Sequence, residues 1–429
     1  MRHSTVKTLK IAVIGGGSTY SPELIDGLIA RAAELGLDEV ALHDIDASRL
    51  HIVGSFCGRM LKAAGAPFGL TLTQDLDTAL DGAGMVFTQI RVGGQRARIL
   101  DEKTGMRFGL IGQETTGVGG FAKALRTIPQ MLAICRRVEA VAPRAWMVNF
   151  TNPSGMVTEA ILRHSVVRCV GLCNIPVNLH LDVAKFIGVP PEKVTLDYVG
   201  LNHLAWVRRV LVGGRDVAAP LFAQNIKGMQ PKNIPDMDYP EALLSALRMF
   251  PGYYNRYYYM AATAGAQQRR KRHTRGEEVL AIENRLLEMY CDPRLHTKPA
   301  MLGKRGGAYY SKAAIDVASA IVNDARNVQI VNVLNAGAID DFYRDASVEI
   351  PCVVGRGGAR PIRIGALEPH LLGMMHVVKA YERIAIEAAV TRSYDKALLA
   401  LLTHPLGGGA EKAPKVLDAL NKVHHLGLT

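Results

Sequence analysis

The sequence lacks several features that define common protein classes. No uninterrupted apolar run approaches the 18 or more residues of a membrane-spanning helix, so we expect no membrane partner. The N-terminus, MRHSTVKTLK, is polar and leads straight into a short apolar strand, unlike a signal or transit peptide. The six cysteines form no CxxC pair and have no regular spacing, which argues against a zinc ribbon and fits a reducing compartment. We therefore expect a cytoplasmic protein.

Aromatic residues are also scarce, at 6% of the chain. The formal net charge of +12 raises nucleic acid as a possible partner. Single-strand binding usually needs aromatic side chains interleaved with basic ones, however, and most arginines are spread along this chain. The basic run QQRRKRHTR at 267–275 is more typical of a solvated helix face, with an anion site for a small substrate as the alternative. We predict no nucleic-acid partner.

Apolar residues are abundant, at 48% of 429 residues. A chain of this length exceeds the roughly 250 to 300 residues at which single cores stop growing, so two or more domains are expected. Over residues 1–175, short apolar runs alternate with amphipathic stretches, which predicts a mainly parallel, doubly wound α/β sheet of the Rossmann type. The predicted strands, apolar throughout as buried parallel strands are, span 10–15, 39–46, 84–90, 145–150 and 166–173.

The pattern changes near residue 175, and we predict a second, α+β domain over 176–429. VTLDYVGLNH and AWVRRVLVGGRDV are typical of antiparallel strands, the second carrying a Gly-Gly turn. Long helical patterns follow in EALLSALRMF, GEEVLAIENRLLEMY, KAAIDVASAIVND and the region from Glu368 onward.

A glycine-rich turn, IAVIGGGSTYSPELI, joins the first predicted strand to a helix. Glycines here let backbone amides approach a pyrophosphate at a helix N-terminus, but the match to GxGxxG is incomplete because Tyr20 replaces the third glycine. Asp44 follows the next strand, where an acid can bind an adenosine ribose, and Asp46 is the alternative. No Walker lysine follows the turn, so a dinucleotide is favoured. The predicted cofactor contacts at the turn are Gly15, Gly17, Ser18 and Thr19.

The spacing of this acid from the turn is unusually long. Gly15 and Asp44 are 29 positions apart, whereas the usual figure is about 20. The first helix must therefore be long, or its connection to the next strand extended.

Several stretches together resemble glycoside hydrolase family 4, the NAD- and metal-dependent glycosidases. They run from Lys10 to about Gly407 and read IAVIGGGSTYSPEL, FGLIGQETTGVGGFAKALRTIP, VNFTNPSGMVTEA, GLCNIP, YVGLNHL, RYYYM, KRGGAYYS and LLTHPLG. Within the family, Asn174 after the metal-binding cysteine resembles the 6-phospho-β-glucosidases, because α-acting members tend to carry Asp or His there.

The resemblance implies an exception to the two-carboxylate scheme of most glycosidases. NAD⁺ takes a hydride from C3 of the sugar, a base removes the acidified C2 proton, and the C1 substituent is eliminated. Water adds to the enone and the same NADH returns its hydride, so the net reaction is hydrolysis. The implied substrates are 6-phospho-β-glucosides such as phosphorylated cellobiose or aryl β-glucosides.

The resemblance places Cys173 and His203 on a divalent metal, with substrate oxygens completing its coordination. Two protein ligands and a mostly oxygen remainder suit Mn²⁺ as well as other divalent ions. Asn202 is expected to orient a ligand or touch the sugar. His180 lies in a helical pattern and is interpreted as structural, and Glu114 as possible support for the metal or a water.

The base implied for the C2 proton is Tyr254, with Tyr253 as the alternative in a cluster of five tyrosines. A phenol ordinarily titrates near 10, so nearby positive charge must lower the pKa of the base. The sequence identifies no general acid, since the Asn174 amide cannot donate a proton usefully, and a water is our hypothesis.

The remaining assignments concern the substrate and the assembly. Arg98 and Arg275 match the family positions expected to bind the 6-phosphate, for which arginine is well suited. Asn152 and Asn174 are expected near the sugar, and Asn149 near the nicotinamide ribose. Family members are often oligomers, so a homodimer or homotetramer is implied. The competing hypotheses are a family member acting on α-linked or non-phosphorylated sugars, including uronides, and a simple NAD-dependent dehydrogenase.

Overall fold

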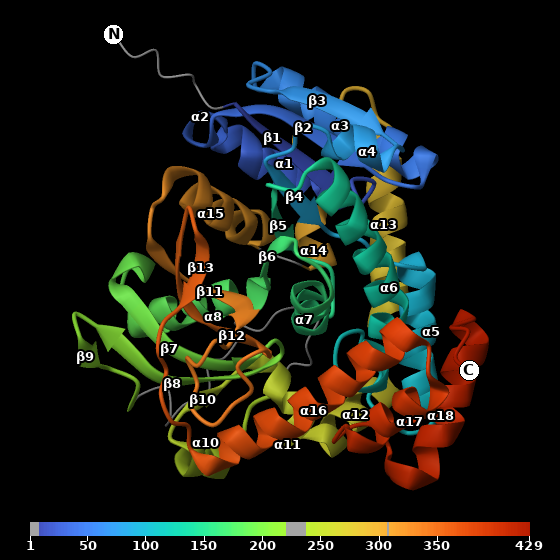
Figure 1. Cartoon of the computed structure of the whole chain (residues 1–429), viewed down its shortest axis with the longest axis vertical. Coiled ribbons are helices and arrows are strands. Elements are labelled where there is room, and N and C mark those ends of the chain that lie inside the picture. Colours follow the sequence, from blue (N-terminus) through green and yellow to red (C-terminus); the bar gives the residue numbers. More distant parts are fainter. Residues whose placement is uncertain (1–7, 220–236, 307–308) are drawn as a thin grey trace.

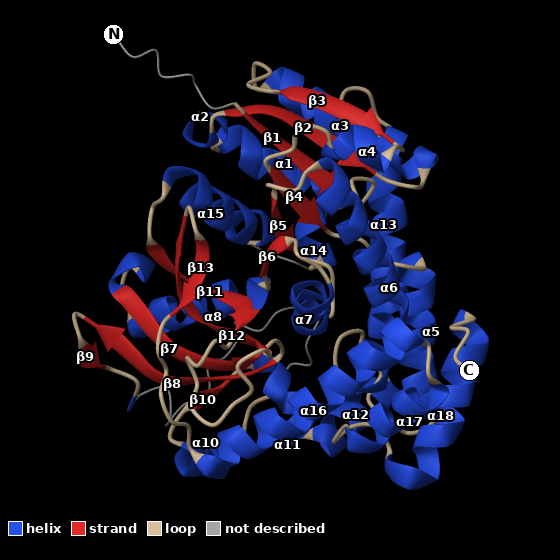
Figure 2. Cartoon of the chain, in the orientation of Figure 1, coloured by secondary structure: helices blue, strands red, loops and turns tan. Residues whose placement is uncertain are grey.

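The computed structural model describes residues 8–219, 237–306 and 309–429. Within these ranges the centre is a nine-stranded sheet in the order β13-β12-β11-β6-β5-β4-β1-β2-β3 (Figure 1 and Figure 2). Most of the N-terminal stretch MRHSTVKTLK, and Gly307 and Ala308 of KRGGAYYS, lie outside the described residues.

Six strands of this sheet are parallel and confirm the predicted doubly wound class. Their order, 3-2-1-4-5-6, reverses direction between β1 and β4, where ligands of such sheets bind at the carboxyl ends of the strands. Sequence periodicity missed β3, because this edge strand is only partly buried and has no continuous apolar run. The parallel strands are β1 (Leu9–Ile14), β2 (Leu37–His43), β3 (Gly69–Thr73), β4 (Met85–Thr88), β5 (Trp146–Asn149) and β6 (Arg168–Gly171).

Three antiparallel strands from the second half of the chain extend the same sheet beyond β6. They are β11 (Asn327–Leu334), β12 (Ser347–Gly355) and β13 (Gly358–Pro361). The join is narrow, since β11 pairs with β6 through Asn332 and Gly171. Our sequence reading made no assignment between KAAIDVASAIVND and Glu368, and it did not identify these strands. The domain boundary near residue 175 stays a prediction, and the central sheet continues across it.

A second, smaller sheet is built on the predicted antiparallel pair. β7 (Val194–Leu201) and β8 (Leu204–Val212) form a hairpin joined by Asn202 and His203, which confirms this pairing. The Gly-Gly turn after β8 leads to β9 (Arg215–Asp216). Both β9 and β10 (Phe250–Pro251) pair with the edge of β8 that lies opposite β7. The hairpin turn therefore projects two polar side chains from the end of this sheet.

Helices pack on both faces of the central sheet. α1 packs with α3 and α15, while α6 packs with α4, α5 and α7 and is covered by α16 (Figure 1). The helical patterns from Glu368 onward are confirmed as α16 to α18. None of the described helices has the length and apolar character required to cross a membrane. The helices are α1 (Ser21–Ala30), α2 (Ala32–Leu35), α3 (Ala47–Ala63), α4 (Leu76–Leu80), α5 (Gly94–Arg107), α6 (Gly117–Val141), α7 (Ser154–His164), α8 (Asn174–Ile187), α10 (Glu241–Leu247), α11 (Arg256–Tyr259), α12 (Ala261–Arg270), α13 (Arg275–Tyr290), α14 (Leu302–Arg305), α15 (Tyr310–Asn323), α16 (Pro369–Thr391), α17 (Tyr394–Thr403) and α18 (Gly409–His424), with short 3₁₀ turns at Pro191–Lys193 and Tyr253–Asn255.

Candidate active site

A cavity of about 1310 Å³ opens at the carboxyl ends of the parallel strands. Its wall includes residues that follow β1, β2, β4, β5 and β6, together with side chains from α5, α6 and the second sheet. Most of the site residues predicted from the sequence lie on it: Gly15, Gly17, Ser18, Asp44, Arg98, Asn152, Cys173, Asn174, His203 and Tyr254.

The glycine turn has the conformation and crowding that only glycine tolerates. Gly15 has a φ of +96°, in the left-handed region, and a Cβ there would lie 3.0 Å from the backbone of Gln89. The Gln89 side chain donates to the carbonyl of Gly15 at 3.1 Å, and its Oε1 accepts from Tyr310. The turn is thus pinned at the strand-order reversal with its backbone at the cavity surface, a cradle that fits a dinucleotide pyrophosphate.

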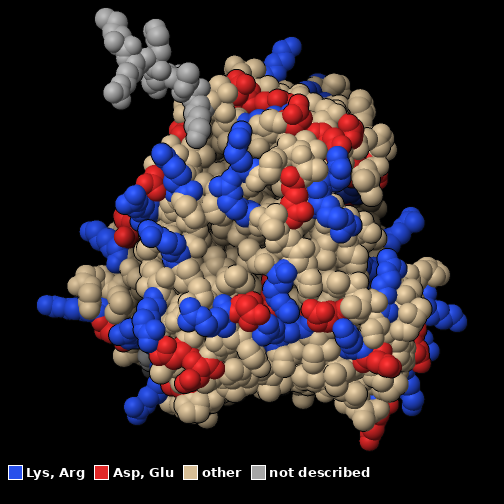
Figure 3. All heavy atoms as spheres, viewed as in Figure 1, with Lys and Arg blue, Asp and Glu red and all other residues tan. Residues whose placement is uncertain are grey.

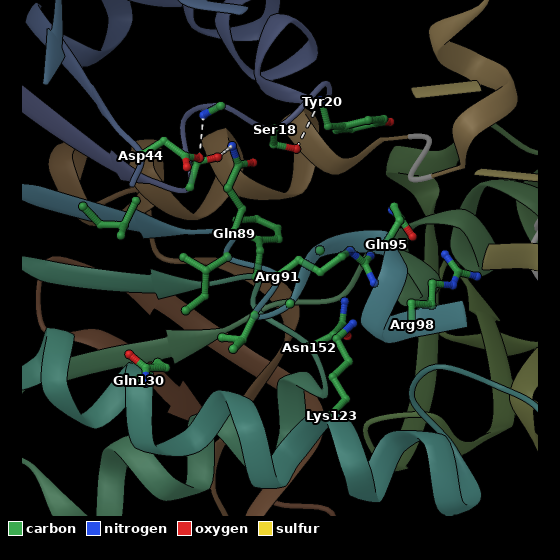
Figure 4. A pocket seen from close by; sticks show the side chains of 18 of the residues that line it. Ser18, Tyr20, Asp44, Gln89, Arg91, Gln95, Arg98, Lys123, Gln130 and Asn152 are labelled. Carbon is green, nitrogen blue, oxygen red and sulfur yellow. Dashed lines mark hydrogen bonds between the residues drawn. The ribbon is translucent and has the colours of Figure 1, made fainter. Parts of the chain in front are cut away.

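Asp44 lies just beyond β2 and is tied to this turn. Its Oδ2 accepts a hydrogen bond from the backbone N–H of Gly17 at 2.8 Å (Figure 4). Its Oδ1 accepts from the N–H of Asp46 at 3.0 Å. Asp46 instead caps α3 by accepting from the backbone of Arg49. The short helix α2 after α1 accounts for the long spacing between glycine turn and acid.

Three predicted residues do not line the cavity. Asn149 is fully buried, and its amide exchanges hydrogen bonds with Thr88, Thr151 and Thr158, so it secures the end of β5 rather than reaching a ligand. The Thr19 side chain is likewise buried. Neither side chain lines the cavity, and the cofactor contacts expected of these two residues stay predictions.

Arg275, at the start of α13, is the third predicted site residue that does not line the cavity. Its guanidinium donates to the carbonyl oxygens of Lys304 and Arg305, and of these Arg305 lines the cavity together with Gly306. Arg275 therefore supports the wall from behind. Residues 269–273 of the basic run are exposed, as expected for solvated positions.

The predicted metal ligands meet although they are 30 positions apart. Cys173 Sγ and His203 Nε2 are 3.5 Å from each other, and both side chains are buried at the cavity wall. Cys173 is the N-cap of α8, where the helix dipole favours a thiolate. Among the described residues, no group of three or more His, Cys, Asp or Glu side chains could hold a metal. The described residues therefore offer two protein ligands, and a bound molecule or water in the cavity would have to supply the others.

The protonation states of the pair suit metal binding. Burial lowers the pKa of His203 to about 3, so its imidazole is neutral and free to coordinate. Burial, followed by the charge of Glu349, raises the pKa of Cys173, which therefore holds its proton until a cation displaces it. His203 also has a φ of +67°, a conformation unusual for a residue with a side chain. Such strain is often found at functional sites.

Tyr254 stacks on this pair, whereas Tyr253 points elsewhere. The rings of Tyr254 and His203 are parallel within 3°, with centroids 3.7 Å apart. Burial, and then the charge of Cys173, raises the pKa of Tyr254 well above 10.0. Tyr253 does not line the cavity, and its hydroxyl donates to Asp182 on α8. The geometry thus favours Tyr254 as the candidate base.

Three basic side chains of the cavity wall, which Figure 4 labels, surround the carboxylate of Glu114. Arg91, Arg98 and Lys123 all form ion pairs with its carboxylate. Burial opposes ionisation, but these charges hold the pKa of Glu114 well below its ordinary range. Arg98 also pairs through Nε with Glu102 at 2.8 Å. When Lys123 is protonated, the three basic side chains outnumber the two carboxylates, so this part of the wall carries a net positive charge. Such a cluster is suited to an anion.

Sequence reasoning did not identify Arg91, Lys123 or Arg305 as part of the site. Arg91 follows β4 at the same edge of the sheet at which Asn152 follows β5, a placement that could have been inferred. Lys123 is the only charged residue in the run GVGGFAKAL at the start of α6, where all nine residues are buried. A lone lysine in such a run was the available signal. The expectation that His180 is structural agrees with its contact to the carbonyl of Val194 at 2.9 Å.

Comparisons with known proteins identify the family of this chain. The model of "Family 4 glycosyl hydrolase" matches residues 10–189, and that of its C-terminal domain matches residues 198–407. The chain is 42% identical to a probable 6-phospho-beta-glucosidase of Bacillus subtilis (strain 168) over 427 residues, covering 97% of each protein.

Two solved structures extend the comparison. The 6-phospho-beta glucosidase of Thermotoga maritima with manganese, NAD⁺ and glucose-6-phosphate has a TM-score of 0.90 and 36% identity, over 98% of this chain and 99% of that one. A 6-phospho-alpha-glucosidase from gut microorganisms, in complex with NAD and Mn²⁺, has a TM-score of 0.88 and 27% identity over 98% of both chains.

Proposed function

The chain belongs to family 4 of the glycosyl hydrolases, and we propose that it hydrolyses 6-phospho-β-glucosides using NAD⁺ and a divalent metal such as Mn²⁺. The observation that carries the proposal is that one cavity joins a glycine turn and Asp44 to the group of Cys173, His203 and Tyr254. A nucleotide site alone would fit many oxidoreductases, but this combination fits a redox-assisted elimination.

When bound, NAD⁺ would accept and return a hydride at C3 of the sugar, and the divalent ion would stabilise negative charge on the sugar oxygens. Cys173 and His203 would hold the ion against the sugar. Asp44 would accept hydrogen bonds from the adenosine ribose, and the amides near Gly15 would face the pyrophosphate.

Tyr254 would remove the C2 proton. Because burial raises its pKa, the free enzyme holds the neutral phenol, and positive charge brought next to His203 would favour the phenolate. The charge of Arg98 also acts on Tyr254, because the guanidinium and the phenol interact electrostatically. After elimination, the phenol would return a proton to C2 when water adds at C1.

The basic group around Glu114 would bind the 6-phosphate. Arg98 lies on the cavity wall with its guanidinium fixed by Glu102 and Glu114, and Lys123 and Arg91 are beside it. Fixed positive charge of this kind favours a phosphorylated sugar over a neutral one. Asn152 and Asn174 also line the cavity and would contact the sugar hydroxyls.

The distribution of charge on the surface favours a small-molecule substrate over nucleic acid. On the face shown in Figure 3, lysine and arginine side chains are scattered among acidic ones and form no continuous basic band. The proposed location is the cytoplasm, where phosphorylated sugars and reduced thiols are found together. All six cysteines are free, and five of them are buried.

The test uses purified protein with 4-nitrophenyl 6-phospho-β-glucoside under reducing conditions, with NAD⁺ and Mn²⁺ supplied singly and together. Release of nitrophenol only when both are present, without accumulation of NADH, is the expected result. Net NADH formation would identify a simple dehydrogenase instead. Faster cleavage of the 6-phospho-α-glucoside would identify an α-acting member, whose family pattern has an acidic residue or histidine where this chain has Asn174.

A further inference from the structure

A buried carboxyl group outside the cavity, that of Glu349 on β12, has no obvious structural partner for its charge. Its side chain is 1% exposed. Among the described residues no ion pair involves it, and no cation contributes to its electrostatic environment. Isolated buried carboxylates are costly, so natural proteins pair them with a cation or a metal.

Within the described part of the chain, every hydrogen bond to the Glu349 carboxyl group comes from a neutral donor. Tyr198 on β7 donates to Oε2 at 2.6 Å, and the amides of Asn202 and Asn332 donate to Oε1 at 2.9 and 3.0 Å. Despite these donors, burial raises the pKa of Glu349. The pocket is therefore shaped for a carboxylate, but the positive charge that would keep it ionised is not supplied by a neighbouring side chain.

Asn202 connects the Glu349 carboxyl group to the candidate metal ligands. This residue precedes His203 in the hairpin turn, receives a hydrogen bond at Oδ1 from the N–H of Gly155, and hydrogen-bonds Cys173 through its side chain. Carboxylate, amide and sulfur thus form one connected chain.

We propose that Glu349 is an outer carboxylate of the metal centre, which holds Asn202 in place against Cys173 and balances the charge of a divalent ion bound by Cys173 and His203. The two negative charges of a Cys173 thiolate and a Glu349 carboxylate match the two positive charges of the ion. Groups that orient metal ligands in this way typically change metal affinity about 10- to 100-fold when replaced. The inference rests on the divalent ion of the proposed function.

The experiment measures Mn²⁺ binding to the whole protein, without sugar, from the electron paramagnetic resonance signal of free Mn²⁺. Wild-type protein that binds no Mn²⁺ would count against the proposed function itself. Given wild-type binding, Glu349→Gln is expected to weaken affinity about tenfold or more. Glu349→Asp, which keeps the charge, should recover much of the loss. Tyr198→Phe is the matched control, since it removes one donor and leaves the carboxylate, and should change affinity less than about threefold.

A thermal melt with and without Mn²⁺ separates this role from a purely structural one. A structural carboxyl would lower the melting temperature of the metal-free and metal-loaded protein equally. The proposal expects Glu349→Gln to lose mainly the increment that Mn²⁺ adds. If Glu349→Gln does not fold, Asn202→Ala breaks the same connection at a partly exposed turn and should also weaken Mn²⁺ binding. Unchanged Mn²⁺ affinity in the folded variant would overturn the proposal.

Discussion

The phenol ring of Tyr254 lies flat against the imidazole of His203, with ring centroids 3.7 Å apart and planes inclined by 3°. The two chain segments are also bonded, because Asn255 Oδ1 accepts from the backbone N–H of Ala205 at 3.2 Å. The candidate base and one candidate metal ligand therefore form a single rigid unit. A base that must act beside the metal gains its position from this stacking.

Replacing Tyr254 by phenylalanine should remove the base while keeping the stacked ring. We expect kcat to fall by at least about 100-fold, within the range for loss of a general base. Incorporation of solvent deuterium at C2 of the sugar, followed by NMR, should fall in parallel. Tyr253→Phe is the comparison: it removes the hydroxyl bonded to Asp182 and should cost about 1 kcal/mol of stability with little loss of exchange. The reverse pattern would make Tyr253 the base.

Cys173→Ser should abolish tight Mn²⁺ binding but leave the fold intact. Serine is itself a preferred N-cap, so α8 should still form. Because a Lewis acid supplies several kcal/mol of charge stabilisation, we expect cleavage of the aryl substrate to fall by about 100-fold or more. Cys291→Ser, at an exposed position, is the control and should behave as wild type. Full activity of the Cys173 variant would contradict its role as a ligand.

Asp44→Asn tests which acid binds the cofactor. Loss of a charged acceptor for the ribose should raise the dissociation constant for NAD⁺ by about tenfold or more, measured by calorimetry. Asp46→Asn should change NAD⁺ affinity little, because Asp46 caps α3 and asparagine is an equally good cap. A larger effect at Asp46 would reverse the assignment.

The two arginines matched to the family should differ in importance. Arg98→Lys keeps the charge but loses the planar contact, and we expect kcat/KM for the phosphorylated substrate to fall about 10- to 100-fold. Arg275→Lys should have a smaller effect, since Arg275 holds the 304–305 backbone rather than lining the cavity. Ratios of kcat/KM for phosphorylated and unphosphorylated aryl glucosides would show the difference. Equal losses would return Arg275 to the phosphate site.

Lys123 should make the free protein less stable at neutral and acidic pH. Burial, followed by the charge of Arg91, lowers its pKa to about 7, against an ordinary 10.5. Below pH 7 the folded state carries the full cost of the buried charge. Between pH 7 and 10.5 the unfolded chain binds more protons, so the free energy of unfolding rises as that cost disappears. Lys123→Met should therefore stabilise the protein near pH 6 by about 1 kcal/mol or more, with the gain shrinking toward pH 10.

A second buried lysine provides the opposite control for this experiment. Burial opposes it, but Glu159 and Glu382 raise the pKa of Lys379. Its stabilising contribution is present at neutral pH and is lost only above about pH 10. Lys379→Met should therefore destabilise the protein throughout pH 6–9 in urea titrations. If both variants shift stability in the same direction, the assignment of Lys123 is wrong.

The sequence by itself determined the features that depend on residues close together in the chain. Alternating apolar and amphipathic stretches indicated the parallel strands, and the glycine turn before α1 indicated the nucleotide site, because each depends on neighbours in the chain. The family resemblance then indicated Cys173, His203 and Tyr254, all of which lie on the cavity.

Tertiary structure decided which side chains face one another. Asn149 and Asn152 follow the same strand, yet Asn149 turns inward to three threonines while Asn152 lines the cavity. β11 to β13 join the central sheet through long-range pairing, and this places Glu349 beside the hairpin of His203. Local periodicity reports which residues are buried, but the register between distant strands sets what they are buried against.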